Sequence, residues 1–437
     1  MRRQTYLLLT LCILVFSTTA EPLPEPLSLQ AALARQLDNH PQLSRQKAQQ
    51  ALAEARHRRA ASKDDVKLGV VLEGRWVEPS RNALHDDHDD SRAGIYLDKT
   101  LYDFGRTRYA TEGAEAGITA EERQLQLKLI QQKQQVMERF FAVLLADLDF
   151  AQKNESMATA FVSFDRAKDR NELGEVSDID LLKDESNYQQ LRLQRLRAEN
   201  QQRHSRQQLA LALNQPGELS SDLLHPALPG NKNPLPEYET LLAEAIKNNL
   251  QLAVLQNRLS ALQSRRKAAQ AEKNPRLFLN MEATEYQRET ASRDPFIVSL
   301  GLDIPLYQGD RVLAGTAEAE AEIQTLKADL RVKKFQLRQE LLNIWQQVQT
   351  LLIQQEQAEV QSNYRDIYLD RSRARYELEI KTDLGDAMAE QSAARLFSAS
   401  TDYKLALARE KLVELTNNTA YSALAPEQPN PDGESSP

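Results

Sequence analysis

Each half of the chain contains two stretches in which apolar and polar residues alternate. An apolar residue at every second position is typical of a β-strand with one apolar face. The pattern predicts strands at about 66–78, 92–102, 276–286 and 295–305. Their apolar positions are Leu68, Val70, Leu72, Trp76, Ile95, Leu97, Leu277, Leu279, Phe296, Val298, Leu300 and Leu302.

Each pair of strands is followed by a long stretch without helix breakers. Neither Gly nor Pro occurs between Gly117 and Gly174, or between Gly315 and Gly385. A helix of ~65 residues would be ~100 Å long, and large apolar residues recur seven apart in both stretches, which favours a coiled coil. We predict long helices at about 107–171 and 311–378, turns at 172–180 and 379–386, and returning helices at 181–214 and 387–416.

The two halves repeat one another. Asn39 and Asn248 begin a stretch that matches at an offset of 209, and Leu101-Tyr102 matches Leu306-Tyr307 at an offset of 205. An offset that holds over about a hundred residues, with a single change of length, indicates a duplication. We predict a first repeat with its linker at 21–236, a second repeat at 237–420 and a disordered tail at 421–437.

The first twenty residues predict a cleaved secretory signal. Arg2 and Arg3 precede an apolar run of eleven residues, and the small residues 17–20 follow it. A membrane anchor is the alternative, but the run is short of the ~20 residues that a spanning helix needs. Removal of residues 1–20 also removes Cys12, the one cysteine of the 437 residues, and changes the net charge from −8 to −10 by the loss of two arginines. An acidic chain argues against nucleic acid as a partner.

The alternating strands alone do not decide between two surroundings. A half-buried sheet of a soluble domain gives the same pattern as membrane-spanning strands, which are apolar outside and polar inside. Export, the lack of cysteine and the presence of only four such strands among long helices favour the membrane. Four strands cannot close a barrel alone, and open sheet edges cannot face lipid. The membrane interpretation therefore requires several copies of the chain.

The order and duplication of several local sequences resemble those of the TolC-like outer-membrane efflux protein family. These sequences are LSLQAALARQLDNHPQL, LYDFGRTR, LYQGDRVL, RNELGEVSDIDLLKDES and RYELEIKTDLGDAMAEQ. The resemblance implies a mainly α fold with a small β part: duplicated long α-helical hairpins and four transmembrane β-strands per chain. It further implies a homotrimer with a shared twelve-stranded barrel, placed in the outer-membrane lipid of a Gram-negative bacterium and continued by a helical tube through the periplasm.

Such a protein would be a passive exit duct of a tripartite efflux or type I secretion system. The resemblance implies a periplasmic adaptor and an inner-membrane transporter as partners, and small molecules, metals or proteins as cargo. The sequence names neither the cargo nor these partners. In the family the helical turns form the periplasmic entrance, and the strands join the long helices at junctions. The corresponding junction residues here are Leu101, Tyr102, Gly105, Leu306, Tyr307 and Gly309.

The candidate entrance residues are Gly174, Asp178, Asp180, Asp383, Gly385 and Asp386. The family pattern has a Gly early in the turn and an Asp six residues later, as Gly174 and Asp180 do. The second half departs from the pattern, with Glu379 in the Gly position and Gly385 in the Asp position. The acids either line a gate or only favour a helix N-terminus, as Asp178 would.

Other functions have weaker support in the sequence. The loop His85 to Asp90 (HDDHDD) carries metal-type ligands, although a solvated charged loop is the commoner explanation. A Gly-rich phosphate loop, an HExxH motif and a nucleophile elbow are all missing from the sequence, so we expect no enzyme, no cofactor and no metal site. The alternative function is a soluble periplasmic coiled-coil adaptor or scaffold, with the strands in a small soluble β domain. The duplicated strand pairs favour the duct.

Overall fold

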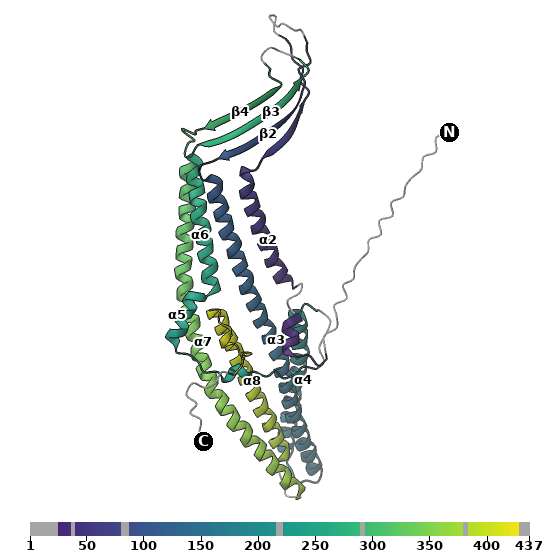
Figure 1. Cartoon of the computed structure of the whole chain (residues 1–437). Helices are drawn as coiled ribbons and strands as arrows, with labels where there is room; N and C mark the ends of the chain where they lie inside the picture. The colour runs from purple at the N-terminus through teal and green to yellow at the C-terminus, as the bar shows by residue number, and fades with distance from the viewer. Residues whose placement is uncertain are drawn as a thin grey trace, which may run out of the picture.

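The computed structural model describes residues 25–35, 40–79, 87–215, 222–288, 293–378 and 383–427. The predicted signal at 1–20, residues 379–382 of the second predicted turn, and residues 428–437 lie outside this part. The chain is elongated, with a small β-sheet at one end and long helices that run away from it to the other end (Figure 1).

Both repeats place the same elements in the same order. The first contains α1 (Leu29–Arg35), α2 (Pro41–Ala61), η1 (Ser62–Asp64), β1 (Lys67–Glu73), β2 (Arg92–Tyr102), α3 (Arg106–Glu172) and α4 (Asp178–Ala212). After η2 (Pro229–Lys232), the second contains α5 (Tyr238–Asn248), α6 (Leu250–Gln270), η3 (Ala271–Lys273), β3 (Arg276–Tyr286), β4 (Phe296–Asp303), α7 (Arg311–Glu377), α8 (Leu384–Thr416) and η4 (Thr419–Tyr421).

The duplication seen in the sequence recurs in the elements. Helices α2 and α6 both have 21 residues and begin 209 residues apart. Helices α3 and α7 both have 67 residues and begin 205 residues apart. The predicted fold class, mainly α with duplicated long helical hairpins and a small β part, is confirmed for the single chain.

The long helices end where the sequence supplies a breaker. Helix α3 is followed by Gly174, which has a φ of +74°. Gly tolerates this left-handed conformation, because it has no Cβ. Ser177 then caps α4, since its Oγ accepts a hydrogen bond from the amide of Asp180. A 67-residue helix is ~100 Å long at ~1.5 Å per residue.

Two hydrophobic clusters hold the helices together about halfway along the helical part. In one, Phe140 and Phe141 of α3 pack with Tyr403 of α8. In the other, Leu337 and Leu341 of α7 pack with further residues of α8. Helix α8 lies between the α3–α4 pair and α7 (Figure 1) and so joins the two repeats.

The sheet has the order β1-β2-β3-β4, and all neighbouring strands are antiparallel. The central pair, β2 and β3, comes from different repeats, so the sheet also joins the two halves of the chain. β1 is shorter than predicted: it ends at Glu73, and Trp76 makes only an isolated bridge with Asp89.

The prediction of a disordered tail from residue 421 is wrong for its first residues. Ser422 and Ala423 are 5% and 0% exposed, and the amide of Gly230 donates a hydrogen bond to the carbonyl of Ala423. The segment is ordered because it fills a gap between the inter-repeat linker and α8, a contact that a local sequence pattern cannot show. Among the residues that the structure describes, no helix is long and apolar enough to cross a membrane.

Candidate channel-forming surfaces

One face of the sheet is mainly apolar across all four strands, with Lys99 and Glu285 as charged residues toward its two ends. The register aligns Leu97 with Leu68 on one side and with Met281 on the other, and Met281 with Val298 of β4. Strand residues that pair directly lie on the same face. The predicted strand positions therefore share this face, and it is largely exposed in the single chain: Leu68 71%, Val70 66%, Leu72 77%, Ile95 53%, Phe296 60%, Val298 53%, Leu300 68% and Leu302 55%, with Leu97, Leu277 and Leu279 half-buried. Trp76 is exposed but lies beyond the end of β1.

The opposite face is more polar. A row of paired residues crosses it from Lys67 through Asp98 and Asn280 to Ser299. Arg92 donates a hydrogen bond to Glu73 across the β1–β2 pair, with 2.6 Å between Nε and Oε2. The sheet thus has one apolar and one polar surface, the arrangement of a strand set between lipid and water.

Aromatic rings lie over glycines on the polar face. A Cβ added to Gly69 would lie 2.5 Å from the ring of Tyr96, and one added to Gly301 would lie 2.3 Å from the ring of Phe278. Each ring therefore covers the backbone of the neighbouring strand. Substitution of either glycine would displace a ring into the space in front of this face.

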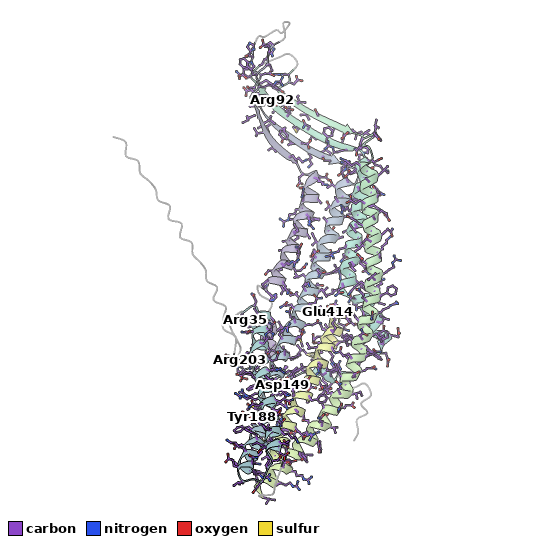
Figure 2. The ribbon with its side chains drawn as sticks, turned by 180° about the vertical axis from the view of Figure 1, so that it is seen from behind. Arg35, Arg92, Asp149, Tyr188, Arg203 and Glu414 are labelled. Atoms are coloured by element: carbon purple, nitrogen blue, oxygen red, sulfur yellow. The ribbon has the colours of Figure 1, made fainter. Side chains whose placement is uncertain are left out.

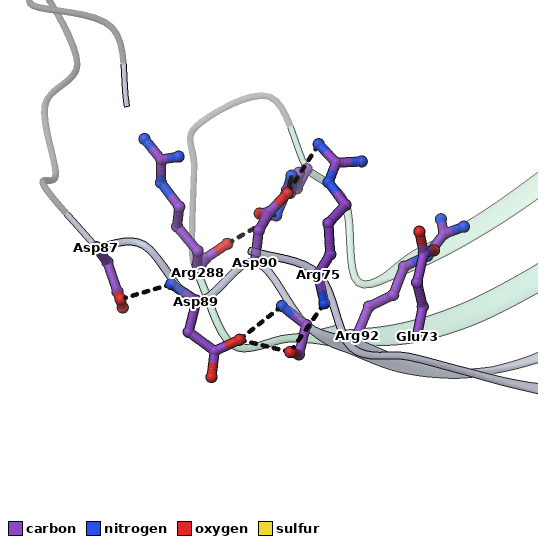
Figure 3. A network of polar contacts seen from close by, with 9 residues as sticks. Glu73, Arg75, Asp87, Asp89, Asp90, Arg92 and Arg288 are labelled. Carbon is purple, nitrogen blue, oxygen red and sulfur yellow. Dashed lines mark hydrogen bonds and ion pairs between the residues drawn. The ribbon is translucent and has the colours of Figure 1, made fainter. Parts of the chain in front are cut away.

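A charge network joins the loops at the outer end of the sheet (Figure 3). Asp90, which is 4% exposed, forms ion pairs with Arg75 (2.9 Å) and Arg293 (2.5 Å). Hydrogen bonds from Arg293 are the main cause that lowers the pKa of Asp90. Arg75 belongs to the first repeat and Arg293 to the second, so this network ties the two hairpins together. The sequence alone does not reveal it, because Asp90 and Arg293 are 203 residues apart.

In the charged loop 85–90, the described residues 87–90 make contacts with neighbouring residues of the protein. The His88 ring stacks on Trp76, with 4.9 Å between ring centroids and an interplanar angle of 6°. Asp89 accepts hydrogen bonds from Ser91. His85 and Asp86 lie outside the described residues, and among the described residues no group of three His, Cys, Asp or Glu is placed to hold a metal ion.

The strand-to-helix junctions contain a glycine with positive φ in each repeat. Gly105 has a φ of +100° and Gly309 a φ of +63°. The Asp103 carboxylate accepts a hydrogen bond from the amide of Thr107 at 2.6 Å and so caps α3. Of the other predicted junction residues, Leu101 and Tyr102 are 44% and 58% exposed, and Leu306 and Tyr307 are 94% and 88% exposed.

The turn between α3 and α4 holds its acidic residues by local hydrogen bonds. Asn171 donates to Asp178 (2.9 Å), and the hydroxyl of Ser177 donates to Asp180 (2.7 Å). Arg170 pairs with Glu175 at 3.1 Å. Asp178 and Asp180 lie in the first turn of α4, where a carboxylate interacts favourably with the helix dipole. This geometry is that of a helix cap, and it leaves both carboxylates exposed.

The start of α8 lies at the same end of the molecule. Asp383 precedes α8 and accepts hydrogen bonds from Tyr368 and from Ser372 (3.3 Å), both on α7. The hydrogen bond from Tyr368 is the main cause that lowers the pKa of Asp383. A Cβ added to Gly385 would lie 2.8 Å from Thr159 of α3, so a glycine here allows α8 to approach the first repeat closely. Asp386 lies in the first turn of α8.

Three buried charged residues of α8 were not anticipated from the sequence. Arg409, Glu410 and Glu414 are 1%, 1% and 2% exposed. Arg409 donates hydrogen bonds to the carbonyls of Asn231 and Asn233 in the linker, Lys133 lies 3.5 Å from Glu410, and Gln131 donates to Glu414 at 2.9 Å. Burial lowers the pKa of Arg409 to about 10. Figure 2 shows Glu414 partway along the helical part of the molecule, and Tyr188 nearer to the end that lies opposite the sheet.

The comparison with protein families gives one match, to the outer membrane efflux protein family over residues 241–418. The matched residues cover almost all of the second repeat. The predicted resemblance to TolC-like efflux proteins is thereby confirmed, and a location in the outer membrane agrees with the family. This family is one of efflux channels and not of enzymes. No curated protein matches the chain.

Solved structures share the fold of this chain over nearly its whole length. The CmeC outer membrane channel of Campylobacter jejuni is 13% identical with a TM-score of 0.72, covering 92% of this chain and 87% of CmeC. A membrane protein from Pseudomonas aeruginosa is 19% identical, with a TM-score of 0.70 over 89% of this chain and 93% of its own. The outer membrane protein VceC from Vibrio cholerae is 15% identical, with a TM-score of 0.68 over 92% and 97%.

Proposed function

We propose that three copies of the chain form a passive outer-membrane exit duct, with a shared twelve-stranded barrel in the lipid and a helical tube in the periplasm. The observation that supports this most strongly is the exposed, mainly apolar face that extends over all four strands. A soluble adaptor would leave that face in water, and apolar patches of this extent are rare on soluble monomers. A lipid environment covers it without another protein.

The dimensions of the strands fit a bilayer. An eleven-residue strand such as β2 or β3 is about 37 Å long at ~3.4 Å per residue. Tilted by about 45°, it spans about 26 Å, close to the apolar band of outer-membrane barrels, which is about 25 Å tall.

The edges of the sheet explain why several copies are needed. Within the described part of the chain, β1 and β4 each pair on one side only. An unpaired edge cannot face hydrocarbon, because its backbone groups would lack hydrogen-bond partners. Pairing of β4 of one copy with β1 of the next satisfies both edges, and three copies supply twelve strands, enough to enclose a water-filled lumen.

The polar face would then line the lumen, and the helical turns would form the periplasmic entrance. Asp180 is exposed at the first turn, so three copies would bring like charges together and attract cations. An inner-membrane transporter and a periplasmic adaptor would deliver the cargo, in keeping with the efflux family of the second repeat.

The test is the conductance of the purified full-length protein in a planar lipid bilayer. A duct gives discrete steps of ion current, and cross-linking of the same sample gives a species of three copies. A single-copy protein that is stable without detergent and gives no current steps would refute the proposal.

A further inference from the structure

The two lateral edges of the chain carry helices that lack a neighbour which their counterparts in the other repeat possess. Next to the sheet, α2, α3, α6 and α7 lie side by side in this order (Figure 1), because each packs against the next. The central contact, between α3 and α6, joins the two repeats. By the offsets of the duplication, α7 corresponds to α3 and α2 corresponds to α6. Helices α7 and α2 can therefore form the same contact only between two copies of the chain.

Corresponding residues differ in exposure at this edge. Leu101, before α3, is 44% exposed, whereas its counterpart Leu306, before α7, is 94% exposed. The second repeat covers the junction of the first, where Arg106 donates a hydrogen bond to the backbone carbonyl of Glu272 at 2.7 Å. A single chain offers no such cover to the junction of the second repeat, so this edge is a surface for a further copy of the first repeat.

The central contact indicates which residues would meet between copies. A Cβ added to Gly113 of α3 would lie 3.3 Å from the Cβ of Ser264 on α6. The offset of 205 converts Gly113 into Glu318 of α7, and the offset of 209 converts Ser264 into Ala55 of α2. A contact of the same form between two copies therefore places the backbone of Glu318 next to that of Ala55.

The edge formed by α2 is basic. The helix contains five Lys and Arg residues and one acidic residue, Glu54, which pairs with Arg58 at 3.9 Å. Arg56 follows Ala55 directly, and Arg59 lies one turn after Ala55 on the same side of the helix. Both arginines are exposed and form no ion pair with another described residue. They are free to meet a carboxylate of another copy.

The edge formed by α7 offers that carboxylate. Two acids near the start of the helix, Glu320 and Glu322, pair with arginines of α6 at 2.6 and 2.9 Å. Glu318 points to neither arginine, is exposed and forms no ion pair with another described residue. The first repeat has Gly113 at the corresponding position, so the carboxylate is a feature of the outer edge alone.

The ion pair of the central contact is not repeated at the outer edges. Within the chain, Arg258 of α6 pairs with Glu121 of α3 at 3.3 Å. The corresponding residues of α2 and α7 are Gln49 and Leu326, which carry no charge. A contact between copies therefore needs its charged residues at another level, and the unpaired charges of the two edges supply them.

We propose that α7 of one copy packs against α2 of the next, with Glu318 facing Arg56 and Arg59. This inference rests on the proposed ring of three copies and names the helix contact that closes it next to the sheet. Pairing of β4 with β1 of the next copy would bring these helices together, as pairing of β2 with β3 accompanies the contact of α3 with α6. The same contact would cover Leu52, which is 42% exposed in the single chain.

The test is disulfide cross-linking of the full-length double variant Ala55→Cys with Glu318→Cys, purified in detergent. The one natural cysteine, Cys12, lies in the predicted signal. The separation of 3.3 Å in the central contact is close to the Cβ distance of a disulfide, about 3.5–4.5 Å. Oxidation should therefore produce covalent species of two and three copies that disappear on reduction.

The matched control combines Ala55→Cys with Gln324→Cys. Gln324 is also exposed on α7 but lies six residues after Glu318, hence about 120° around the helix and about 9 Å along its axis. This pair should give no covalent species.

Charge reversal tests the ion pairs themselves. Glu318→Arg should lower the ratio of assembled to single copies about thirtyfold in analytical ultracentrifugation, because each exposed pair contributes about threefold and a ring contains three. Addition of Arg56→Glu to this variant should restore most of the loss.

The outcomes separate this contact from the duct itself. A three-copy protein that conducts but forms no disulfide between positions 55 and 318 would overturn the contact and leave the duct standing, and so would losses that simply add in the doubly reversed variant. An unchanged protein that remains a single copy would refute both proposals.

Discussion

The apolar face of the sheet yields a sharp prediction through the variant Val298→Arg. Val298 pairs with Met281, the middle residue of β3, which in turn pairs with Leu97, the middle residue of β2. The substitution thus places a guanidinium at mid-height of the strands. In the middle of a bilayer a lipid-facing Arg costs about 2–4 kcal/mol. Three copies would raise this to about 6–12 kcal/mol per assembled barrel.

The neighbouring residue provides the control. Ser299 lies on the opposite face, where its row contains Asn280 and Asp98. Ser299→Arg introduces the same side chain at nearly the same depth but on the polar face, next to Asn280. Its effect on stability should stay within about 0.5 kcal/mol, as for an ordinary exposed substitution.

The assay is urea unfolding of both variants after insertion into phosphatidylcholine vesicles, followed by tryptophan fluorescence. The midpoint for Val298→Arg should fall well below that of the unchanged protein, while that of Ser299→Arg should not move. Equal midpoints for the two variants would show that the two faces meet the same surroundings, and the assignment of the apolar face to lipid would then be wrong.

Three further substitutions test other parts of the molecule. Phe141→Ala removes a ring that is 1% exposed and stacked on Tyr403; it should cost about 3–5 kcal/mol, seen as a lower denaturation midpoint, and a loss below about 1 kcal/mol would contradict this packing. Asp90→Asn should lower the melting temperature at neutral pH. Because the pKa of Asp90 is lowered in the folded protein, this difference from the unchanged protein should shrink as the pH falls through that lowered value; a difference independent of pH would exclude the ion pairs as its source. Asp180→Asn should reduce cation selectivity in single-channel recordings, and unchanged selectivity would place Asp180 away from the pore.

Much of the fold followed from local patterns. The absence of Gly and Pro predicted two very long helices, and Gly174 marked the end of the first one. Residue parity placed Leu68 and Val70 on one face of β1. The register of the sheet, which no single strand reveals, extended that face over all four strands.

The contacts that the sequence did not predict are those between distant residues. From the sequence alone, Arg409 is expected to be a solvent-exposed charge on an amphipathic helix. It is buried instead, because linker carbonyls 176 and 178 residues away in sequence accept its hydrogen bonds. Asp90 is tied to an arginine of the other repeat. Ala423 is buried under the linker although it belongs to a stretch rich in polar residues and proline. Local composition carries no information about such partners, and the entrance and lipid-facing residues remain predictions.

The unequal offsets of the duplication have a consequence for symmetry. Between the short 3-10 turn and the long helix, the first repeat has 41 residues (65–105) and the second has 37 (274–310). A ring of three copies would present six similar hairpins, alternately longer and shorter. A molecule that binds the outer rim would therefore meet three identical binding sites, each a third of a revolution from the next. The helices below the rim, α3 and α7, both have 67 residues, so the helical tube would come much nearer to sixfold symmetry.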